Sequence, residues 1–262
     1  LYLLAPINTG DEYKLELLAG VYTIATILPL FATTIYIFAR PLKHIHPSLV
    51  YWNSSIGKEV LQVGGAFFVI QLGLLVVNST NQFLINYLFG GAAVVEYTLY
   101  YRLYSTASMV FTLFTQPVWS EISIRYAKDD MLWVRKIYHF MLFIAVGISV
   151  GGLVVTGGLQ VVFRIWLGEG IHANRWIGLI YAVWSMVEVL TYAGTCIANG
   201  MTKLKCQMYF TIGAAVAKIP LTILCATVLP NWIGVIVAHI LVLVPLMVAQ
   251  NIVLCRQLRK VA

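Results

Sequence analysis

Residues 60–88 read VLQVGGAFFVIQLGLLVVNSTNQFLINYL, and this stretch decides the class of fold. It carries no charged side chain and exceeds the roughly 20 residues that a helix needs to cross about 30 Å of hydrocarbon. Six further, largely apolar stretches occupy residues 15–38, 94–116, 137–159, 176–199, 206–229 and 232–254. Because lipid offers no hydrogen-bond partners to the backbone, such stretches fold as helices. The sequence therefore predicts an all-α integral membrane protein with about seven transmembrane helices.

The composition excludes an ordinary soluble protein. Hydrophobic residues make up 60% of the 262 residues and charged residues 10%, against about 45–50% and about 25% in soluble domains. The seven stretches leave only short connections, so no extramembrane domain is expected. The four cysteines lack the spacing of a metal or disulfide site, and we interpret them as buried structural residues. They are Cys196, Cys206, Cys225 and Cys255.

Basic residues are distributed unevenly between the two sides of the membrane. Lys and Arg accumulate in cytoplasmic connections, and placing the C-terminal end inside puts twelve of the 17 basic residues on that side. These are Arg40, Lys43, Lys58, Arg125, Lys128, Arg135, Lys136, Lys203, Lys205, Arg256, Arg259 and Lys260. Only Lys14, Arg164 and Arg175 fall outside. We therefore expect a cytoplasmic C-terminus, and the net charge of +7 indicates contact with anionic lipid and not with nucleic acid.

Polar side chains interrupt the apolar stretches in stripes along one helical face. Such groups are costly in hydrocarbon, so they face a protein interior or a wet path. Residues 60–88 carry Gln71, Asn78, Asn81, Gln82 and Asn86. Residues 94–116 carry Tyr97, Tyr101, Tyr104 and Arg102. The later stretches carry Tyr181, Ser185, Glu188, Tyr192 and Thr195, then Gln207, Thr211, Lys218 and Thr222, and finally His239 and Gln250.

Each stripe also has a purely structural interpretation. The amides can be hydrogen-bonding contacts between helices, and the tyrosines an aromatic belt at the membrane interface. Glu188 and Lys218 can form a structural ion pair. Arg102 can pair with Glu96 or with a helix-end carbonyl, and His239 is more typical of a packing histidine.

The chain shows no motif of a known catalytic site. Spacings typical of hydrolases, metalloproteases and phosphate-binding loops are absent from the sequence, so we expect a transporter, not an enzyme, with no cofactor and no metal. Residues 118–136 mix aromatic and charged side chains, which predicts a helix lying on the inner membrane surface. The odd number of spans and the start without Met suggest the C-terminal part of a longer protein.

Residues 81–136 resemble the seventh and eighth helices, and the following loop, of Wzx-type O-antigen and polysaccharide flippases of the multidrug/oligosaccharidyl-lipid/polysaccharide exporter superfamily. The matching residues are Asn81, Leu88-Phe89-Gly90, Val95, Tyr97, Tyr101-Arg102-Leu103, Pro117 and Trp119 closing the eighth helix, Lys128-Asp129-Asp130 and Trp133. Phe163 and Trp166-Leu167-Gly168 also resemble the family. The resemblance covers about residues 60–170.

The resemblance implies helices six to twelve of a transporter built from two bundles. Residues 1–38 would be the last helix of a truncated N-terminal bundle, residues 39–58 the cytoplasmic connection between bundles, and residues 59–262 a C-terminal bundle of six helices. It further implies the bacterial inner membrane, with a polysaccharide polymerase and chain-length proteins as possible partners. The substrate would be an oligosaccharide linked to undecaprenyl diphosphate, which the protein carries to the outer leaflet by alternating access.

The residues suggest how such a substrate would be held. We expect Arg102 and Lys218 to line a wet cleft and to screen the diphosphate, while Glu188 couples transport to protons or sodium. The sugars would meet Asn78, Asn81, Gln82, Tyr97, Tyr101 and Tyr104. The alternatives are a cation-coupled drug exporter of the same superfamily, which favours acidic residues in its cavity, and a membrane polymerase or acyltransferase of polysaccharide assembly.

Overall fold

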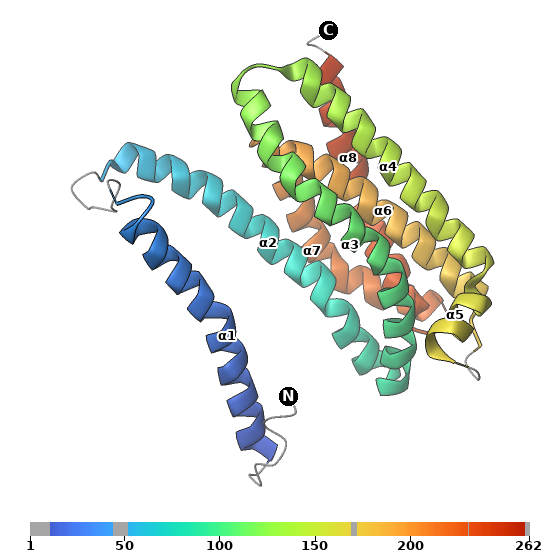
Figure 1. Ribbon diagram of the computed structural model, residues 1–262. Coiled ribbons are helices and arrows are strands. Elements are labelled where there is room, and N and C mark those ends of the chain that lie inside the picture. The colour runs from blue at the N-terminus through green and yellow to red at the C-terminus, as the bar shows by residue number, and fades with distance from the viewer. Residues whose placement is uncertain (1–10, 44–51, 169–171, 230, 260–262) are drawn as a thin grey trace. The chain divides into compact units, whose positions relative to one another are not determined.

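A computed structural model describes residues 11–43, 52–168, 172–229 and 231–259 of the chain. Throughout these ranges the regular secondary structure is helical (Figure 1). The helices are α1 (Asp11–Ala39), α2 (Ser54–Phe89), α3 (Gly91–Ala127), α4 (Met131–Gly157), α5 (Leu159–Leu167), α6 (Arg175–Gly200), α7 (Lys205–Val228) and α8 (Ile233–Arg259). Four of the seven predicted spans lie wholly within a long helix, and the spans 137–159, 206–229 and 232–254 extend past theirs by one or two residues. The structure adds the short α5.

Six of the helices are long and apolar enough to cross a membrane: α1, α2, α4, α6, α7 and α8. The chain is thus an all-helical, multi-pass membrane protein, which confirms the predicted fold class. The seventh predicted span, 94–116, lies in α3, a helix of 37 residues that tyrosine, serine and threonine side chains make less apolar. α3 packs along α4 and α6 in the same bundle.

The predicted surface helix over 118–136 is wrong. α3 continues past Pro117 to Ala127, and α4 begins at Met131, so this segment consists of two helix ends and a turn. Pro117 therefore does not close a helix as expected. A proline removes one backbone hydrogen bond, but membrane helices tolerate it because neighbouring helices and polar side chains can satisfy the freed carbonyl.

Charged side chains stabilise the turn between α3 and α4. Asp130 caps α4 by accepting a hydrogen bond from the Trp133 N–H at 3.2 Å. The Arg125 guanidinium donates to Glu121 at 2.7 Å and to Asp130 at 3.2 Å. These hydrogen bonds, first to Glu121 and then to Asp130, raise the pKa of Arg125. The charges that suggested a surface helix thus serve to end one helix and to start the next.

The chain separates into two compact units, residues 1–58 and residues 59–262. The division falls within α2, between residues 58 and 59, where the C-terminal bundle is predicted to start. In the first unit, the apolar part of α1 buries none of its residues within the structure. That this unit is the remainder of another bundle stays a prediction.

The second unit is a bundle with α6 at its centre. α6 packs against α3, α4 and α8, while α7 packs against α8 (Figure 1). In its most apolar window α6 has 67% of its residues buried, whereas α2 has only 17%. α2 makes few close contacts with the other helices of this unit. It joins α3 through a tight reversal at Gly90, whose φ of 83° favours glycine.

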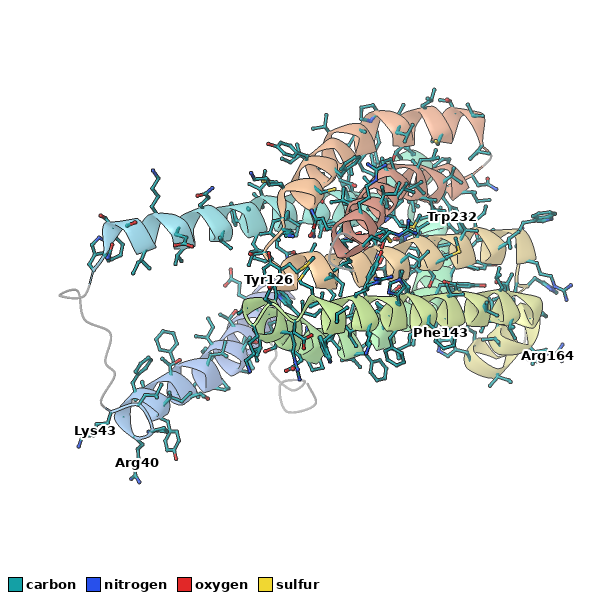
Figure 2. The ribbon with its side chains drawn as sticks, turned by 90° about the horizontal axis from the view of Figure 1, so that it is seen from above. Arg40, Lys43, Tyr126, Phe143, Arg164 and Trp232 are labelled. Carbon is teal, nitrogen blue, oxygen red and sulfur yellow. The ribbon has the colours of Figure 1, made fainter. Side chains whose placement is uncertain are left out.

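The outer surface of the bundle is apolar. Phe143 of α4 is 75% exposed and Ile165 of α5 is 81% exposed. Figure 2 places Tyr126 and Arg164 at opposite ends of the bundle, with Phe143 between them. An apolar surface between two polar ends is typical of helices that face lipid.

Candidate functional site

A cavity of about 420 Å³ lies between α2, α6 and α7, with Trp119 of α3 at its edge. We call it the amide cavity because amide and hydroxyl side chains form its polar wall. These side chains are Gln71, Asn78 and Ser79 of α2, Tyr192, Thr195 and Asn199 of α6, and Gln207 of α7. Among the described residues that line it, none carries a charge.

Helical spacing brings these side chains to one face. Gln71 and Asn78 are seven residues apart on α2, and Tyr192, Thr195 and Asn199 follow each other after three and four residues on α6. Positions with these separations lie above one another on a helix. Because α2 is loosely packed, its polar face meets that of α6 across an open space instead of a tight contact.

Two acceptors of the amide cavity have no partner. The side-chain oxygens of Asn199 and Gln207 are buried and accept no hydrogen bond from any described residue. A buried acceptor without a donor costs about 1–3 kcal/mol. The cavity is therefore suited to a neutral molecule rich in hydroxyl donors. The neighbouring Phe67 and Trp119 rings, 5.9 Å apart between centroids, add an aromatic edge.

A second group of polar residues is sealed inside the bundle beside the cavity. Asn81 of α2 donates from Nδ2 to Nδ1 of His239 on α8 at 2.8 Å. His239 Nε2 lies 3.7 Å from the Glu188 carboxylate of α6, which is an ion-pair distance but too long for a hydrogen bond. The three side chains are 3%, 1% and 8% exposed, so the group ties three helices together away from solvent.

The buried group and the amide cavity meet at one residue. Tyr192, which lines the cavity, follows Glu188 by four residues on α6, so the two side chains lie on the same face of this helix. A change of charge at Glu188 would therefore change the electrostatic potential at Tyr192 in the cavity wall. His239, which the sequence suggested as a packing residue, is the centre of this group.

Lys218 does not take the position expected from the sequence. It is completely buried, and its Nζ donates to the Val235 carbonyl at 3.4 Å. The alternative of a Glu188–Lys218 ion pair is wrong, because His239 lies opposite Glu188. Lys218 does not belong to the described lining of the amide cavity.

Arg102 is exposed on α3, and no hydrogen bond or ion pair of its side chain occurs within the described residues. Its expected partner Glu96 instead accepts a hydrogen bond from Trp232 Nε1 at 2.9 Å, so the Arg102–Glu96 pairing is wrong. The structure does not bring Arg102 and Lys218 into one cleft, because one is on the surface and the other is enclosed.

The tyrosines of α3 belong to an aromatic cluster and not to the amide cavity. Tyr97 and Tyr104 are buried against Tyr181 of α6, and half-buried Tyr101 lies 5.4 Å from Trp184 between ring centroids. Tyr97 and Tyr104 therefore belong neither to an interfacial belt nor to the wall of the amide cavity. Gly178 of α6 leaves room for one of these rings, since a Cβ atom added there would lie 3.0 Å from the Tyr104 hydroxyl oxygen.

The predicted amides of α2 separate into three environments. Asn78 lines the amide cavity, Asn81 is buried against His239, and Gln82 is exposed and outside the cavity lining. Tyr192, Thr195 and Gln207 belong to the polar stripes visible in the sequence but are not among the predicted substrate contacts. Asn199 had no signal of its own, since it lies in the last turn of its helix.

No cluster of three or more potential metal ligands occurs in the described part of the chain. A scan against models of protein families, a search of curated proteins and a search of solved structures find no match. The likeness to polysaccharide flippases therefore rests only on the residues of this chain that resemble the family.

Proposed function

We propose that the chain belongs to a transporter that moves an oligosaccharide linked to undecaprenyl diphosphate across the bacterial inner membrane, for the assembly of O-antigen, capsule or exopolysaccharide. The observation that carries this proposal is the amide cavity. This uncharged cavity, with exposed amides of α2 on one side and buried amide oxygens of α6 and α7 on the other, suits a substrate that is polar and neutral where it is bound, as a glycan is.

The chemistry of the cavity wall favours a glycan over the alternatives. Sugar hydroxyls can donate to the free oxygens of Asn199 and Gln207, which otherwise remain unsatisfied. A cationic drug would favour a carboxylate, and the described lining of the cavity has none. A polymerase or acyltransferase would favour a histidine or acid at the cavity, but His239 and Glu188 are sealed behind its wall.

The loose packing of α2 supports an alternating-access mechanism. α2 forms one wall of the cavity, and Asn81 ties it to α8 through His239. A helix with few buried residues can shift at low cost, which would open the cavity to one side or the other. In this proposal Glu188 is the coupling residue, because loss of its charge would weaken the contact with His239. Arg102 would meet the diphosphate at the bundle surface.

Translocation should depend on the two free amide oxygens. In the full-length protein, Asn199→Leu and Gln207→Leu should each lower the initial rate of translocation about tenfold, since each removes a hydrogen bond to a buried acceptor. The assay would follow a fluorescent lipid-linked oligosaccharide in proteoliposomes. Asn86→Leu, an exposed amide of α2 outside the cavity, is the matched control and should keep the wild-type rate.

Protein levels in the vesicles would be equalised before rates are compared. A wild-type rate for both cavity variants would overturn the proposal. Transport of a cationic drug by the wild-type protein, with no transport of the lipid-linked sugar, would favour the drug exporter instead.

A further inference from the structure

A second cavity lies at the lysine-rich end of the bundle. It has a volume of about 360 Å³ and is formed by the connection between α6 and α7 on one side and by α8 on the other. We call it the lysine-end cavity. None of its described lining residues also lines the amide cavity, so the two are separate sites.

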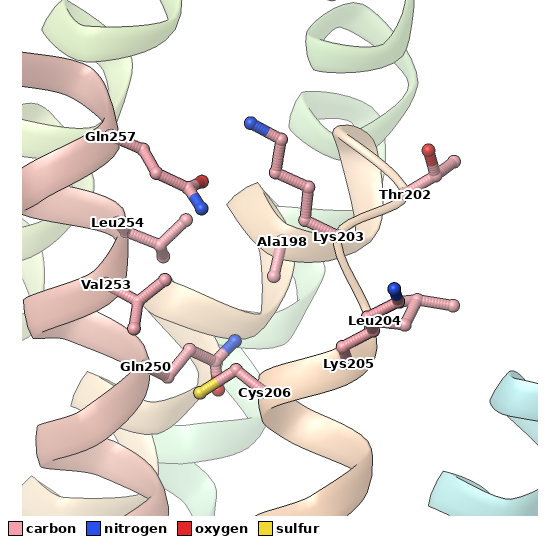
Figure 3. A pocket seen from close by; sticks show the side chains of 10 residues that line it. All are labelled: Ala198, Thr202, Lys203, Leu204, Lys205, Cys206, Gln250, Val253, Leu254 and Gln257. Carbon is pink, nitrogen blue, oxygen red and sulfur yellow. The ribbon is translucent and has the colours of Figure 1, made fainter. Parts of the chain in front are cut away.

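Gln250 of α8 is a buried amide that points into this space. It is 2% exposed, and neither its side-chain nitrogen nor its side-chain oxygen has a hydrogen-bond partner among the described residues. Figure 3 shows Gln250 and Gln257 entering the cavity from α8, with Lys203 and Cys206 entering from the opposite side. A buried amide whose nitrogen and oxygen both lack hydrogen-bond partners destabilises the protein unless a ligand supplies an acceptor and a donor.

The first turn of α7 lines the same cavity. Leu204, Lys205 and Cys206 are part of the lining, and no side chain caps the start of this helix of 24 residues. The first backbone N–H groups of a helix have no partner within the helix, and the helix dipole makes this end positive. Such an end binds phosphate and other anions.

Lys203 adds a positive charge to the start of α7. It is half-buried and lines the cavity, and its Nζ lies 5.5 Å from the centroid of the Tyr126 ring. The aromatic ring restricts the ammonium group to this end of the bundle. The free helix amides, the lysine and the free amide of Gln250 together form a site for a phosphate group with further polar oxygens.

The remainder of the wall is apolar and reaches the outer surface. Ala198, Leu204 and Leu254 are buried, whereas Val253 on the same wall is 37% exposed. A free phosphate ion would gain nothing from such a wall, but the chain of a lipid would bury apolar surface along it. A basic site between helices near a membrane surface suits an anionic lipid headgroup.

We propose that the lysine-end cavity binds the phosphate headgroup of an anionic membrane lipid. The α7 amides and Lys203 hold the phosphate, Gln250 holds a second headgroup oxygen, and the lipid chain leaves past Val253. The phosphate can belong to a glycerophospholipid or to a polyprenyl phosphate, and the experiment separates these sources. The inference does not depend on the proposed transport of sugars.

Lipid affinity of the delipidated full-length protein, measured by native mass spectrometry, tests the site. Phosphatidylglycerol should bind about tenfold more tightly than phosphatidylcholine with the same chains, since charge-assisted bonds to phosphate favour the anionic lipid. Lys203→Gln should lower the phosphatidylglycerol affinity about fivefold. Gln250→Leu should lower it about tenfold. Lys128→Gln, an exposed lysine outside the lining, is the matched control and should change it by about twofold or less.

A thermal readout separates a binding role of Gln250 from a structural one. Without lipid, Gln250→Leu should raise the melting temperature, because it removes an unsatisfied buried amide, while the stabilisation on adding phosphatidylglycerol should shrink. A lower melting temperature without lipid, together with unchanged lipid affinity, would overturn the proposal.

The source of the phosphate follows from two further probes. Farnesyl diphosphate that displaces phosphatidylglycerol from the wild-type protein, but not from Lys203→Gln, would support a polyprenyl ligand. If neither farnesyl diphosphate nor inorganic phosphate displaces phosphatidylglycerol, the result would support a glycerophospholipid ligand. Inorganic phosphate that displaces the lipid as effectively as farnesyl diphosphate does would overturn the lipid site, as would equal affinities for the two phospholipids.

Discussion

The role of a buried polar residue depends on the group that it contacts. In this bundle the contacts differ from those that the spacing of polar residues along the helices suggests. Glu188 and Lys218 both lie near the middle of their helices, but Glu188 faces His239 and Lys218 donates to a backbone carbonyl. Asn81 completes the group from α2. A stripe shows that a face is polar, whereas the helix opposite that face decides which atoms meet.

The contact between Asn81 and His239 should be measurable as a coupling energy. A double-mutant cycle with Asn81→Ala and His239→Ala should give about 0.6 kcal/mol and at most about 1.7 kcal/mol, the range of hydrogen bonds between membrane helices. Unfolding of the purified protein in mixed micelles is the measurement. Asn86→Ala combined with His239→Ala is the control, since Asn86 is exposed, and its coupling should be near zero. Zero coupling in both cycles would contradict the observed bond.

Close approach of whole helices depends on a few glycines. A Cβ atom added at Gly234 of α8 would lie 2.6 Å from the Cys225 carbonyl oxygen of α7, which is backbone and cannot turn aside. A Cβ at Gly73 of α2 would lie 2.6 Å from the Thr211 side chain. At Gly213 of α7 the same addition meets nothing within 4 Å. Small residues thus set the distance between α7 and α8 and the nearest approach of α2 to α7.

Two glycine substitutions should have opposite effects on stability. Gly234→Ala should lower the free energy of unfolding by about 1–3 kcal/mol, because the backbone of α7 must move to admit the methyl group. Gly213→Ala should raise it by up to about 1 kcal/mol, because alanine favours the helix and meets open space. Both variants would be unfolded in the same detergent. A Gly234→Ala protein as stable as Gly213→Ala would show that the two helices are not in close contact.

For the whole molecule, charge asymmetry predicts the orientation in the membrane. Arg125, Lys128, Arg135 and Lys136 lie in or beside the turn between α3 and α4, and Lys203 and Lys205 lie at the connection between α6 and α7. At the other end only Arg164 and Arg175 flank the segment between α5 and α6. Figure 2 shows Tyr126, beside the first turn, and Arg164, in α5, at opposite ends of the bundle. Anionic lipid and the insertion machinery favour the basic end inside.

Reporter insertions should confirm this orientation. A reporter inserted after Asp129 or after Thr202 should be active only as a cytoplasmic reporter, and one inserted after Ala173 only as a reporter of the opposite side of the membrane. Dual reporters of enzyme activity or fluorescence in cells would measure it. Replacing Lys203 and Lys205 with Gln should weaken the preference without reversing it, because ten of the twelve basic residues assigned to the inside remain. Inverted activity at all three positions would contradict the predicted topology.

The fold class and the helix positions could be predicted because they depend on local properties. An apolar stretch long enough to cross lipid must satisfy its backbone internally, so each stretch from 15–38 to 232–254 is helical in the structure. The predictions were wrong at the ends of two helices. The sequence placed a helix end at Pro117, but α3 continues to Ala127, and a turn with an ion pair between Arg125 and Asp130 separates it from α4. The polar stripes were also visible in the sequence.

By itself, the sequence determined that this chain is a helical membrane protein whose helices carry polar faces, because hydropathy and helical periodicity act along a single segment. Only the tertiary structure decided that Asn78 faces Gln207 and Asn199 in a shared cavity, that His239 joins Asn81 to Glu188, and that Lys218 is enclosed. These contacts join segments far apart in the chain, and they depend on the rotation and crossing of each helix, which are set by packing throughout the bundle.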